Sequence, residues 1–253
     1  MSPVAPESSC AAAFLASSNH GERKDGRRPD TIILHYTGMA SSTAALDWLR
    51  DPASKVSCHY FIWEDGRIVQ LVSEGRRAWH AGQSSWFGET DLNSASVGIE
   101  IANPGHDGGL PPFPDAQIVA VIALCRDVSR RLGVPAARIL AHSDIAPLRK
   151  SDPGEKFPWA RLHSAGIGHY VTPVPIARDD ERRHDDPWPA GIEALQSSFA
   201  AYGYDVPVSG VYCAKTEAVV RAFQRHFRPE RVDGIADQST VATLRGLIRT
   251  LPT

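Results

Sequence analysis

Two short apolar segments of the chain end in histidine, and a third segment places an aspartate in a Pro-Gly loop. The segments are Thr31-Ile-Ile-Leu-His35 and Ile139-Leu-Ala-His142, and Asp152-Pro-Gly154 follows the second one. An apolar run of this length, bounded by Gly or Pro, predicts a buried strand. Two such strands could bring two imidazoles and one carboxylate together at one end of a sheet. Two histidines, a carboxylate and a water molecule are the ligand set of a catalytic zinc site.

Residue type and spacing alone leave that interpretation open. The chain contains 10 histidines, and a histidine at a strand end is commonly a surface residue or a hydrogen-bonded one. The three candidates are also far apart in the sequence, without a compact motif such as H-E-x-x-H. A metal site therefore needs support from the rest of the sequence.

An ordered series of short motifs gives this support. In chain order the motifs are His35-Tyr-Thr37, Ser57-x-His59-Tyr60, Asp65-Gly-x-Ile-x-Gln70, Ala78-Trp-His-Ala-Gly82, Ser96-Val-Gly-Ile-Glu100, Gly133-x-Pro135, Ala141-His-Ser-Asp144, Lys150-x-Asp-Pro-Gly154 and Phe157-Pro-Trp159. Together they resemble the zinc-dependent N-acetylmuramoyl-L-alanine amidases, whose fold is shared with peptidoglycan recognition proteins. The resemblance covers about residues 17–165 without a large gap.

The resemblance implies a reaction and a set of ligands. The reaction is hydrolysis of the amide bond between the lactyl group of N-acetylmuramic acid and L-alanine, in peptidoglycan or in (anhydro)muropeptides. The zinc ligands would be His35, His142 and Asp152. Zinc would polarise the amide carbonyl and lower the pKa of a bound water molecule to about 7.

Two further residues are candidates for the chemistry itself. Glu100 ends an apolar strand, where a carboxylate is costly and its pKa is raised, so it suits the role of general base that the resemblance also assigns to it. A buried salt bridge to an arginine such as Arg76 is the alternative. Lys150 lies two residues before Asp152 and in an extended segment would point to the same side, where it could stabilise the oxyanion. A solvated loop lysine is the alternative there.

Four other residues are candidates for a substrate groove, without being needed as metal ligands. They are His59, Trp79, His80 and Asn103.

The pattern of the first two thirds of the chain predicts an α/β fold, with a mixed central β-sheet flanked by helices. Expected strands cover 31–36, 60–63, 68–72 and 96–102, and Asp65-Gly66 predicts a hairpin between the middle two. Expected helices cover 42–49, with Ser42 or Thr43 as N-cap, and 115–132, ended by Gly133.

The rest of the chain predicts a second, helical domain. Residues 171–189 are rich in proline and charge and predict a linker between a catalytic domain at 1–170 and a three-helix domain at 190–253. Val208-Ser-Gly-Val-Tyr212 and Val232-Asp-Gly-Ile-Ala236 form an internal near-repeat, each followed by a threonine and a helical pattern. The segment resembles the peptidoglycan-binding domain of cell-wall hydrolases, and a helical dimerisation domain is the alternative.

Composition and charge exclude some partners. A net charge of -2 gives no reason to expect nucleic acid, and no apolar stretch approaches the roughly 20 residues of a membrane span. The four cysteines are widely spaced, which favours free thiols, and Cys125 fits the apolar side of a helix. The sequence leaves the oligomeric state unknown.

Location and substrate form stay open at this stage. The first residues have neither the positive start nor the apolar core of a secretion signal, which favours the cytoplasm and soluble anhydromuropeptides. The C-terminal domain favours polymeric murein, with a periplasmic or wall-associated location as the alternative. Two other function classes compete: a non-catalytic peptidoglycan receptor on the same fold, and a serine hydrolase, for which no Gly-x-Ser-x-Gly motif is present.

Overall fold

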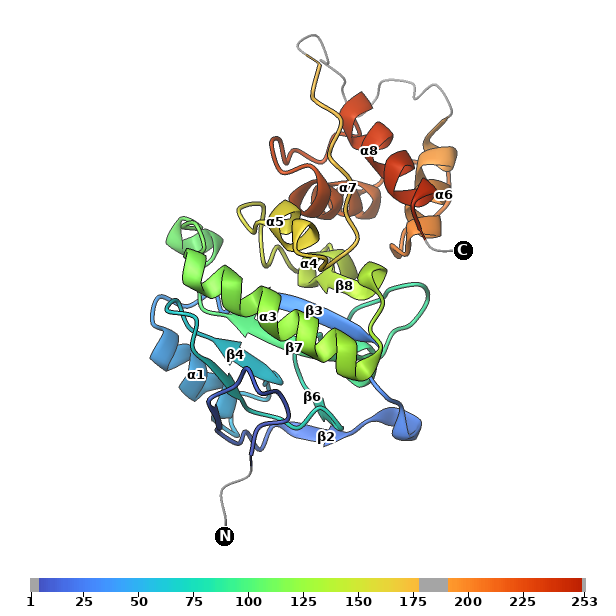
Figure 1. Cartoon of the computed structure of the whole chain (residues 1–253). Helices are drawn as coiled ribbons and strands as arrows, with labels where there is room; N and C mark the ends of the chain where they lie inside the picture. Colours follow the sequence, from blue (N-terminus) through green and yellow to red (C-terminus); the bar gives the residue numbers. More distant parts are fainter. Residues whose placement is uncertain (1–4, 178–190, 252–253) are drawn as a thin grey trace.

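The computed structural model describes residues 5–177 and 191–251, in which strands alternate with helices before three C-terminal helices (Figure 1). The strands are β1 (Ala13–Phe14), β2 (His20–Glu22), β3 (Thr31–Tyr36), β4 (Tyr60–Ile62), β5 (Ile68–Gln70), β6 (Arg76–Ala78), β7 (Ser96–Ile101) and β8 (Ile139–Ala141). The α-helices are α1 (Ser42–Arg50), α2 (Leu92–Ala95), α3 (Asp115–Leu132), α4 (His142–Ile145), α5 (Trp159–Ser164), α6 (Gly191–Tyr202), α7 (Ala214–Phe227) and α8 (Gln238–Arg249).

Six of the strands form one mixed sheet in the order β1-β5-β4-β7-β3-β8. The pairs β4·β7, β7·β3 and β3·β8 are parallel, whereas β4 and β5 form the antiparallel hairpin that Asp65-Gly66 predicted. β2 and β6 pair separately. The sheet confirms the predicted fold class, and it places the carboxyl ends of β3, β7 and β8 side by side.

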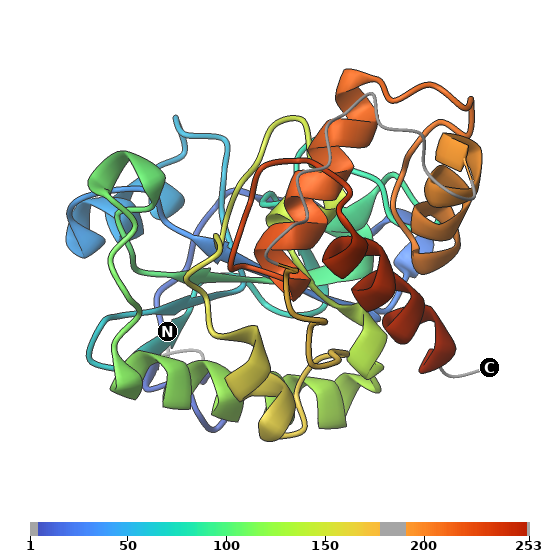
Figure 2. The same ribbon diagram turned by 90° about the horizontal axis from the view of Figure 1, so that it is seen from above.

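The central strand β3 divides its side chains between two cores. Ile32 and Leu34 belong to the core under α3, together with residues of β4 and β7. Ile33 belongs to a different core, which the C-terminal helices share. Since successive side chains of a strand point to opposite faces, His35 lies on the face opposite α3. Figure 2 shows α3 on one face of the sheet and α1 with the C-terminal helices on the other.

The strongest local patterns placed their elements correctly. The helix α3 begins and ends where the sequence predicted, and Gly133 closes it with a left-handed φ of 73° and a bond from its N–H to Ser129. The N-cap prediction for α1 was wrong, because Ser41 caps the helix by accepting from the N–H of Ala44. Strands β4, β5 and β7 end one or two residues earlier than expected.

The C-terminal helices pack directly against the sheet, which the linker pattern did not reveal. Leu195, Phe199 and Phe223 share one core with Ile33 and Leu140 of the sheet. The predicted linker 171–189 extends into 178–190, which lies outside the described residues, and the domain boundaries stay predictions. The composition of a connecting segment does not indicate whether the parts that it joins pack against each other. Here the sheet and the C-terminal helices bury apolar surfaces against each other.

A buried polar contact fixes the same junction. Asp144 of α4 is fully buried and accepts hydrogen bonds from the Tyr204 hydroxyl, at 2.7 Å, and from the main-chain N–H of Ala141, at 2.8 Å. Nδ1 of His226, on α7, lies 2.7 Å from the same carboxylate. The C-terminal helices therefore hold the short helix that begins with His142.

Two smaller expectations can be compared with the structure. All four cysteines are free, and Cys125 is fully buried in the core under α3, as its place in the helical pattern predicted. Within the described ranges, no helix has both the length and the apolar character needed to cross a membrane.

Candidate metal centre

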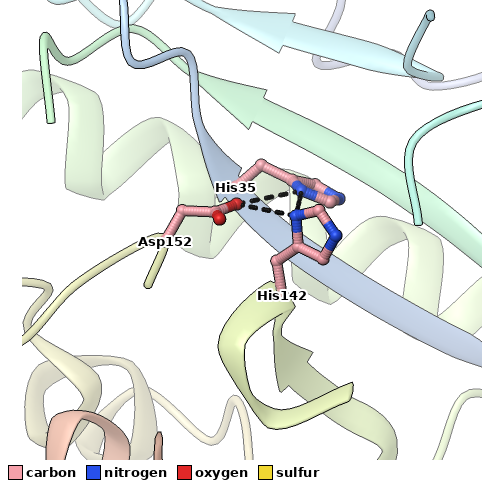
Figure 3. A group of neighbouring side chains, drawn as sticks. All are labelled: His35, His142 and Asp152. Atoms are coloured by element: carbon pink, nitrogen blue, oxygen red, sulfur yellow. Dashed lines mark hydrogen bonds and ion pairs between the residues drawn. The ribbon is translucent and has the colours of Figure 1, made fainter. Parts of the chain in front are cut away.

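Three side chains that are far apart in the sequence meet beside the carboxyl end of β3. His35 lies near the end of β3, His142 is the first residue of α4, and Asp152 lies in the loop that follows (Figure 3). The two Nδ1 atoms are 2.9 Å apart, and Oδ2 of Asp152 lies 3.1 Å from His35 and 3.0 Å from His142. All three side chains are buried, and their ligand atoms lie within 4.8 Å of one another.

A chain of hydrogen bonds sets the tautomer of His35. The Ser96 hydroxyl donates its hydrogen to the carbonyl oxygen of Leu92, so it can only accept from Nε2 of His80, 3.2 Å away. Neutral His80 then carries its proton on Nε2, and its Nδ1 accepts from Nε2 of His35 at 3.0 Å. Consequently Nδ1 of His35 has no proton and presents its lone pair to the cluster.

A single hydrogen bond sets the tautomer of His142. Its Nε2 lies 3.1 Å from the carbonyl oxygen of Ala81, which can only accept, so Nε2 carries the proton and Nδ1 the lone pair. Two imidazole lone pairs and a carboxylate oxygen thus converge on one point, with no hydrogen-bond donor among them. These three atoms repel one another unless a cation lies between them. Imidazole nitrogens and a carboxylate oxygen are ligand atoms that fit zinc.

The electrostatics agree with the ligand states that a metal requires. Burial, together with the neighbouring His142, lowers the pKa of His35 to about 4, so its imidazole is neutral. For Asp152, burial alone would raise the pKa, but the neighbouring His142 and His35 side chains hold it well below its ordinary value, so the carboxyl group is ionised. The site therefore offers a neutral His35 imidazole and an anionic Asp152 carboxylate.

Glu100 lies beside the cluster because of strand register. It is paired with His35 across the parallel strands β7 and β3, so both side chains share one face of the sheet. Its Oε2 is buried and has no hydrogen-bond partner among the described residues. Burial, and then the Asp152 carboxylate, raise the pKa of Glu100 well above its ordinary value. The alternative salt bridge is absent from the described contacts, since Arg76 pairs with Glu22.

Lys150 lies at the edge of the same site and is exposed. Its ammonium has neither a hydrogen bond nor an ion pair within the described parts of the chain. After burial and Asp152, its charge is the next influence on the pKa of Glu100, and it opposes the other two. The lysine is thus close enough to act on charge in the site and is not committed to another carboxylate.

The structure gives the predicted groove residues different surroundings. His59 is fully buried, with Nδ1 accepting from the N–H of Gly98 and Nε2 near the carbonyl of Arg76. His80 is also buried, behind His35. Asn103 is buried and bonds to the main chain at Gly105, and Trp79 is half-buried. The geometry thus gives His80 a contact with a ligand, whereas substrate contacts for all four stay predictions.

Sequence reasoning missed Ser96, and it predicted a substrate role for His80 and not a contact with His35. Ser96 and His80 both fall within motifs that the sequence showed, but their bonds to each other and to His35 depend on how β7 and the segment after β6 meet in space. Gly98 is part of that contact, because a Cβ built on it would lie 2.4 Å from the His80 ring. The absence of a side chain in the middle of a buried strand was the one available signal.

Comparison with known proteins agrees with this geometry. Residues 25–155 match the family model described as N-acetylmuramoyl-L-alanine amidase, and residues 189–244 match a model of a peptidoglycan binding domain. The amidase AmiD of Escherichia coli is 35% identical over 94% of this chain and 95% of its own length. The 1,6-anhydro-N-acetylmuramyl-L-alanine amidase AmpD of Escherichia coli is 33% identical over 60% of this chain and 90% of its own.

Two solved structures are similar over nearly the whole chain. AmiD of Escherichia coli, in complex with anhydro-N-acetylmuramic acid-L-Ala-D-gamma-Glu-L-Lys, has a TM-score of 0.75 and covers 90% of this chain and 92% of its own. AmpDh3 of Pseudomonas aeruginosa, in complex with anhydromuramic pentapeptide, has a TM-score of 0.77 at 33% identity and covers both chains fully. The similarity therefore includes the C-terminal helices as well as the sheet.

Proposed function

This chain belongs to the N-acetylmuramoyl-L-alanine amidase family, and from that membership we propose that His35, His142 and Asp152 hold one zinc ion at which anhydromuropeptides are hydrolysed. The enzyme cleaves the amide bond between the lactyl group of N-acetylmuramic acid and L-alanine. The observation that supports the zinc is the convergence of two imidazole lone pairs and one carboxylate, with no donor between them.

The residues around the ligands divide the chemistry among them. A bound zinc ion would polarise the scissile carbonyl and activate a water molecule. Glu100, whose raised pKa favours taking up a proton, would take the proton of the attacking water and pass it to the departing amine of L-alanine. Lys150 would place its unpaired ammonium near the carbonyl oxygen, where negative charge develops.

The substrate class is supported by the solved relatives. The AmiD and AmpDh3 structures contain an anhydromuramoyl peptide, and each relative is similar to this chain over nine tenths of its length or more. We therefore take a muramoyl peptide with a 1,6-anhydro ring as the test substrate. The cellular compartment stays a prediction.

A combined metal and activity measurement tests the proposal. The purified chain should contain about one zinc per molecule by mass spectrometry of the metal, and should release L-alanine-terminated peptide from anhydromuramoyl tripeptide. His142→Ala should lose both zinc and turnover. Glu100→Gln should keep zinc and its melting temperature but lose about 10² to 10⁴ in kcat. Full zinc in His142→Ala would refute the ligand assignment, and normal turnover in Glu100→Gln would refute its role as base.

A further inference from the structure

A groove of about 400 Å³ lies between the loop leading to Asp152 and one face of helix α7. From the loop it is lined by Pro147, Leu148, Arg149, Lys150 and Ser151, and from the helix by Ala214, Glu217, Ala218, Arg221 and Arg225. The helix positions follow a spacing of three and four residues, so they form a single stripe on α7. One wall of the groove thus comes from the C-terminal helices and the other from the catalytic segment.

The charges in this groove are unbalanced. Its lining holds four cations and one anion, Glu217, which already pairs with Arg221. Arg149 donates to the carbonyl oxygens of Ala81 and Gln83, and it pairs with no carboxylate among the described residues. Lys150 has no ionic partner among the described residues. A groove with this excess of positive charge is suited to an anionic ligand.

Arg225 is the most buried of these cations. Its side chain is only 18% exposed, and its Nε is buried without a hydrogen-bond partner in the described residues. The nearest carboxylate, Glu155, lies 3.8 Å from that Nε and also lies 3.1 Å from Nε2 of His106. Burial lowers the pKa of Arg225 because its charge has lost water without gaining a close partner. A ligand carboxylate in the groove would supply a second negative charge to this guanidinium, besides the distant Glu155.

The groove lies next to the segment that leads to the metal centre, because Lys150 and Ser151 line it and Asp152 is the next residue. A second groove, of about 340 Å³, shares residues 147–149 with the first. Its two cations are Arg149 and Lys215, of which Lys215 is paired with Asp205, and Lys150 does not line it. The first groove is therefore the one that combines an excess of cations with Lys150, two residues before Asp152.

We propose that α7 forms one wall of the substrate groove, and that Arg225 binds a carboxylate of the peptide part of the substrate. This inference rests on the proposed function, since the peptide leaves from the amide bond held at the metal centre. The peptide in the AmiD complex contains L-alanine followed by a γ-linked D-glutamate. A glutamate linked through its γ-carboxyl keeps a free α-carboxylate one residue beyond the scissile bond.

The C-terminal helices would then select substrates in addition to any anchoring role. An arginine can hold a carboxylate through two parallel hydrogen bonds, and an amidated stem would offer only one acceptor and no charge. The enzyme should therefore prefer anhydromuramoyl-L-Ala-γ-D-Glu-L-Lys over the same compound with the α-carboxylate converted to a carboxamide.

Steady-state kinetics of the full-length, zinc-loaded enzyme on these two compounds tests the proposal. For the wild type we expect a KM about tenfold lower for the acid than for the amide, at similar kcat, as for the loss of a charge-assisted hydrogen bond. Arg225→Gln should raise the KM for the acid about tenfold and leave the amide unchanged, so that the preference disappears. Arg225→Lys should recover part of it.

Arg245→Gln is the matched control, because Arg245 is exposed on α8 and outside the groove. The proposal is overturned if Arg225→Gln behaves like this control, or if it weakens both compounds equally. Should Arg225→Gln fail to fold, the wild type alone decides, since equal KM values for acid and amide would refute carboxylate recognition. A wild type that cleaves neither compound would instead contradict the proposed function.

Discussion

Replacing Ser96 by alanine should weaken zinc binding although Ser96 touches no ligand atom of the cluster. In the wild type its hydroxyl donates to Leu92 and accepts from Nε2 of His80, and this fixes the proton of His80 on the side away from His35. Without the hydroxyl, His80 can move its proton to Nδ1. Nε2 of His35 must then accept, and its proton moves to Nδ1, where the metal should bind.

The size of the effect follows from the free-energy cost that the substitution adds to zinc binding. Keeping the original tautomer leaves a buried N–H of His80 without an acceptor, which costs about 1 to 3 kcal/mol. Changing the tautomer avoids that cost but makes the metal displace a proton from His35. Both routes predict zinc binding weaker by roughly 10- to 100-fold, the usual effect of losing a group that orients a metal ligand.

The assay is competition for zinc against a chelator, combined with ¹⁵N chemical shifts of the histidine rings in the metal-free protein. Ser17→Ala is the matched control, because Ser17 is also buried and also donates to a main-chain carbonyl, that of Leu49, far from the cluster. We expect His35 to show an unprotonated Nδ1 in the wild type and in the control, but not in Ser96→Ala. Equal zinc affinity and equal ring shifts in all three proteins would refute the reasoning.

Three further predictions follow from the contacts described above. A chain ending at Ala177 should melt at a lower temperature and lose activity on soluble muropeptides, measured by calorimetry and product release, because the sheet would lose the apolar helices that cover it. Lys150→Met should keep zinc, but its kcat on the tripeptide substrate should fall by a factor of about 10² to 10³. An unchanged kcat would mean that Lys150 is a solvated loop lysine without a role in catalysis. For Asp237, burial raises the pKa, but the hydrogen bond from Thr240 and the charge of Arg228 contribute to a net lowering. Its stabilising effect is therefore present above pH 3.8 and lost as the pH falls further, so urea denaturation should find Asp237→Asn about 3 to 5 kcal/mol less stable at pH 7 and closer to the wild type in acid.

The truncation prediction reverses an expectation that the sequence alone supported. The proline- and charge-rich segment 171–189 suggested a tether, and all proposed catalytic residues precede it. A tethered module should be removable without loss of hydrolysis. In the structure Asp144, two residues after His142, is held by Tyr204 and His226, so removing the helices would leave a buried carboxylate without two of its partners. The sequence could not show this contact because its members are 60 and 82 residues apart.

Local sequence patterns predicted correctly those elements whose ends depend only on the residues within and next to them. The apolar spacing of α3 and the glycine that ends it were enough to give both ends of that helix. The N-cap of α1 was not predictable with the same precision, because Ser41, Ser42 and Thr43 are all good caps, and the choice depends on where the chain enters the helix. Strand ends were also approximate, since pairing with a neighbour decides where a strand stops.

The candidates for the reacting groups could be predicted from the sequence. Two histidines at strand ends, an aspartate after them and a glutamate inside an apolar strand identified a candidate metal site and base, because these residue types are costly to bury without a partner. The tautomers of the two histidines and the charges around the cluster follow only from the tertiary structure. Only the three-dimensional contacts set the tautomers of His35 and His142 through Ser96 and the Ala81 carbonyl, and only they bring the cations of α7 beside the metal centre. A hydrogen atom's position and a groove's charge depend on atoms that are neighbours in space and distant in sequence.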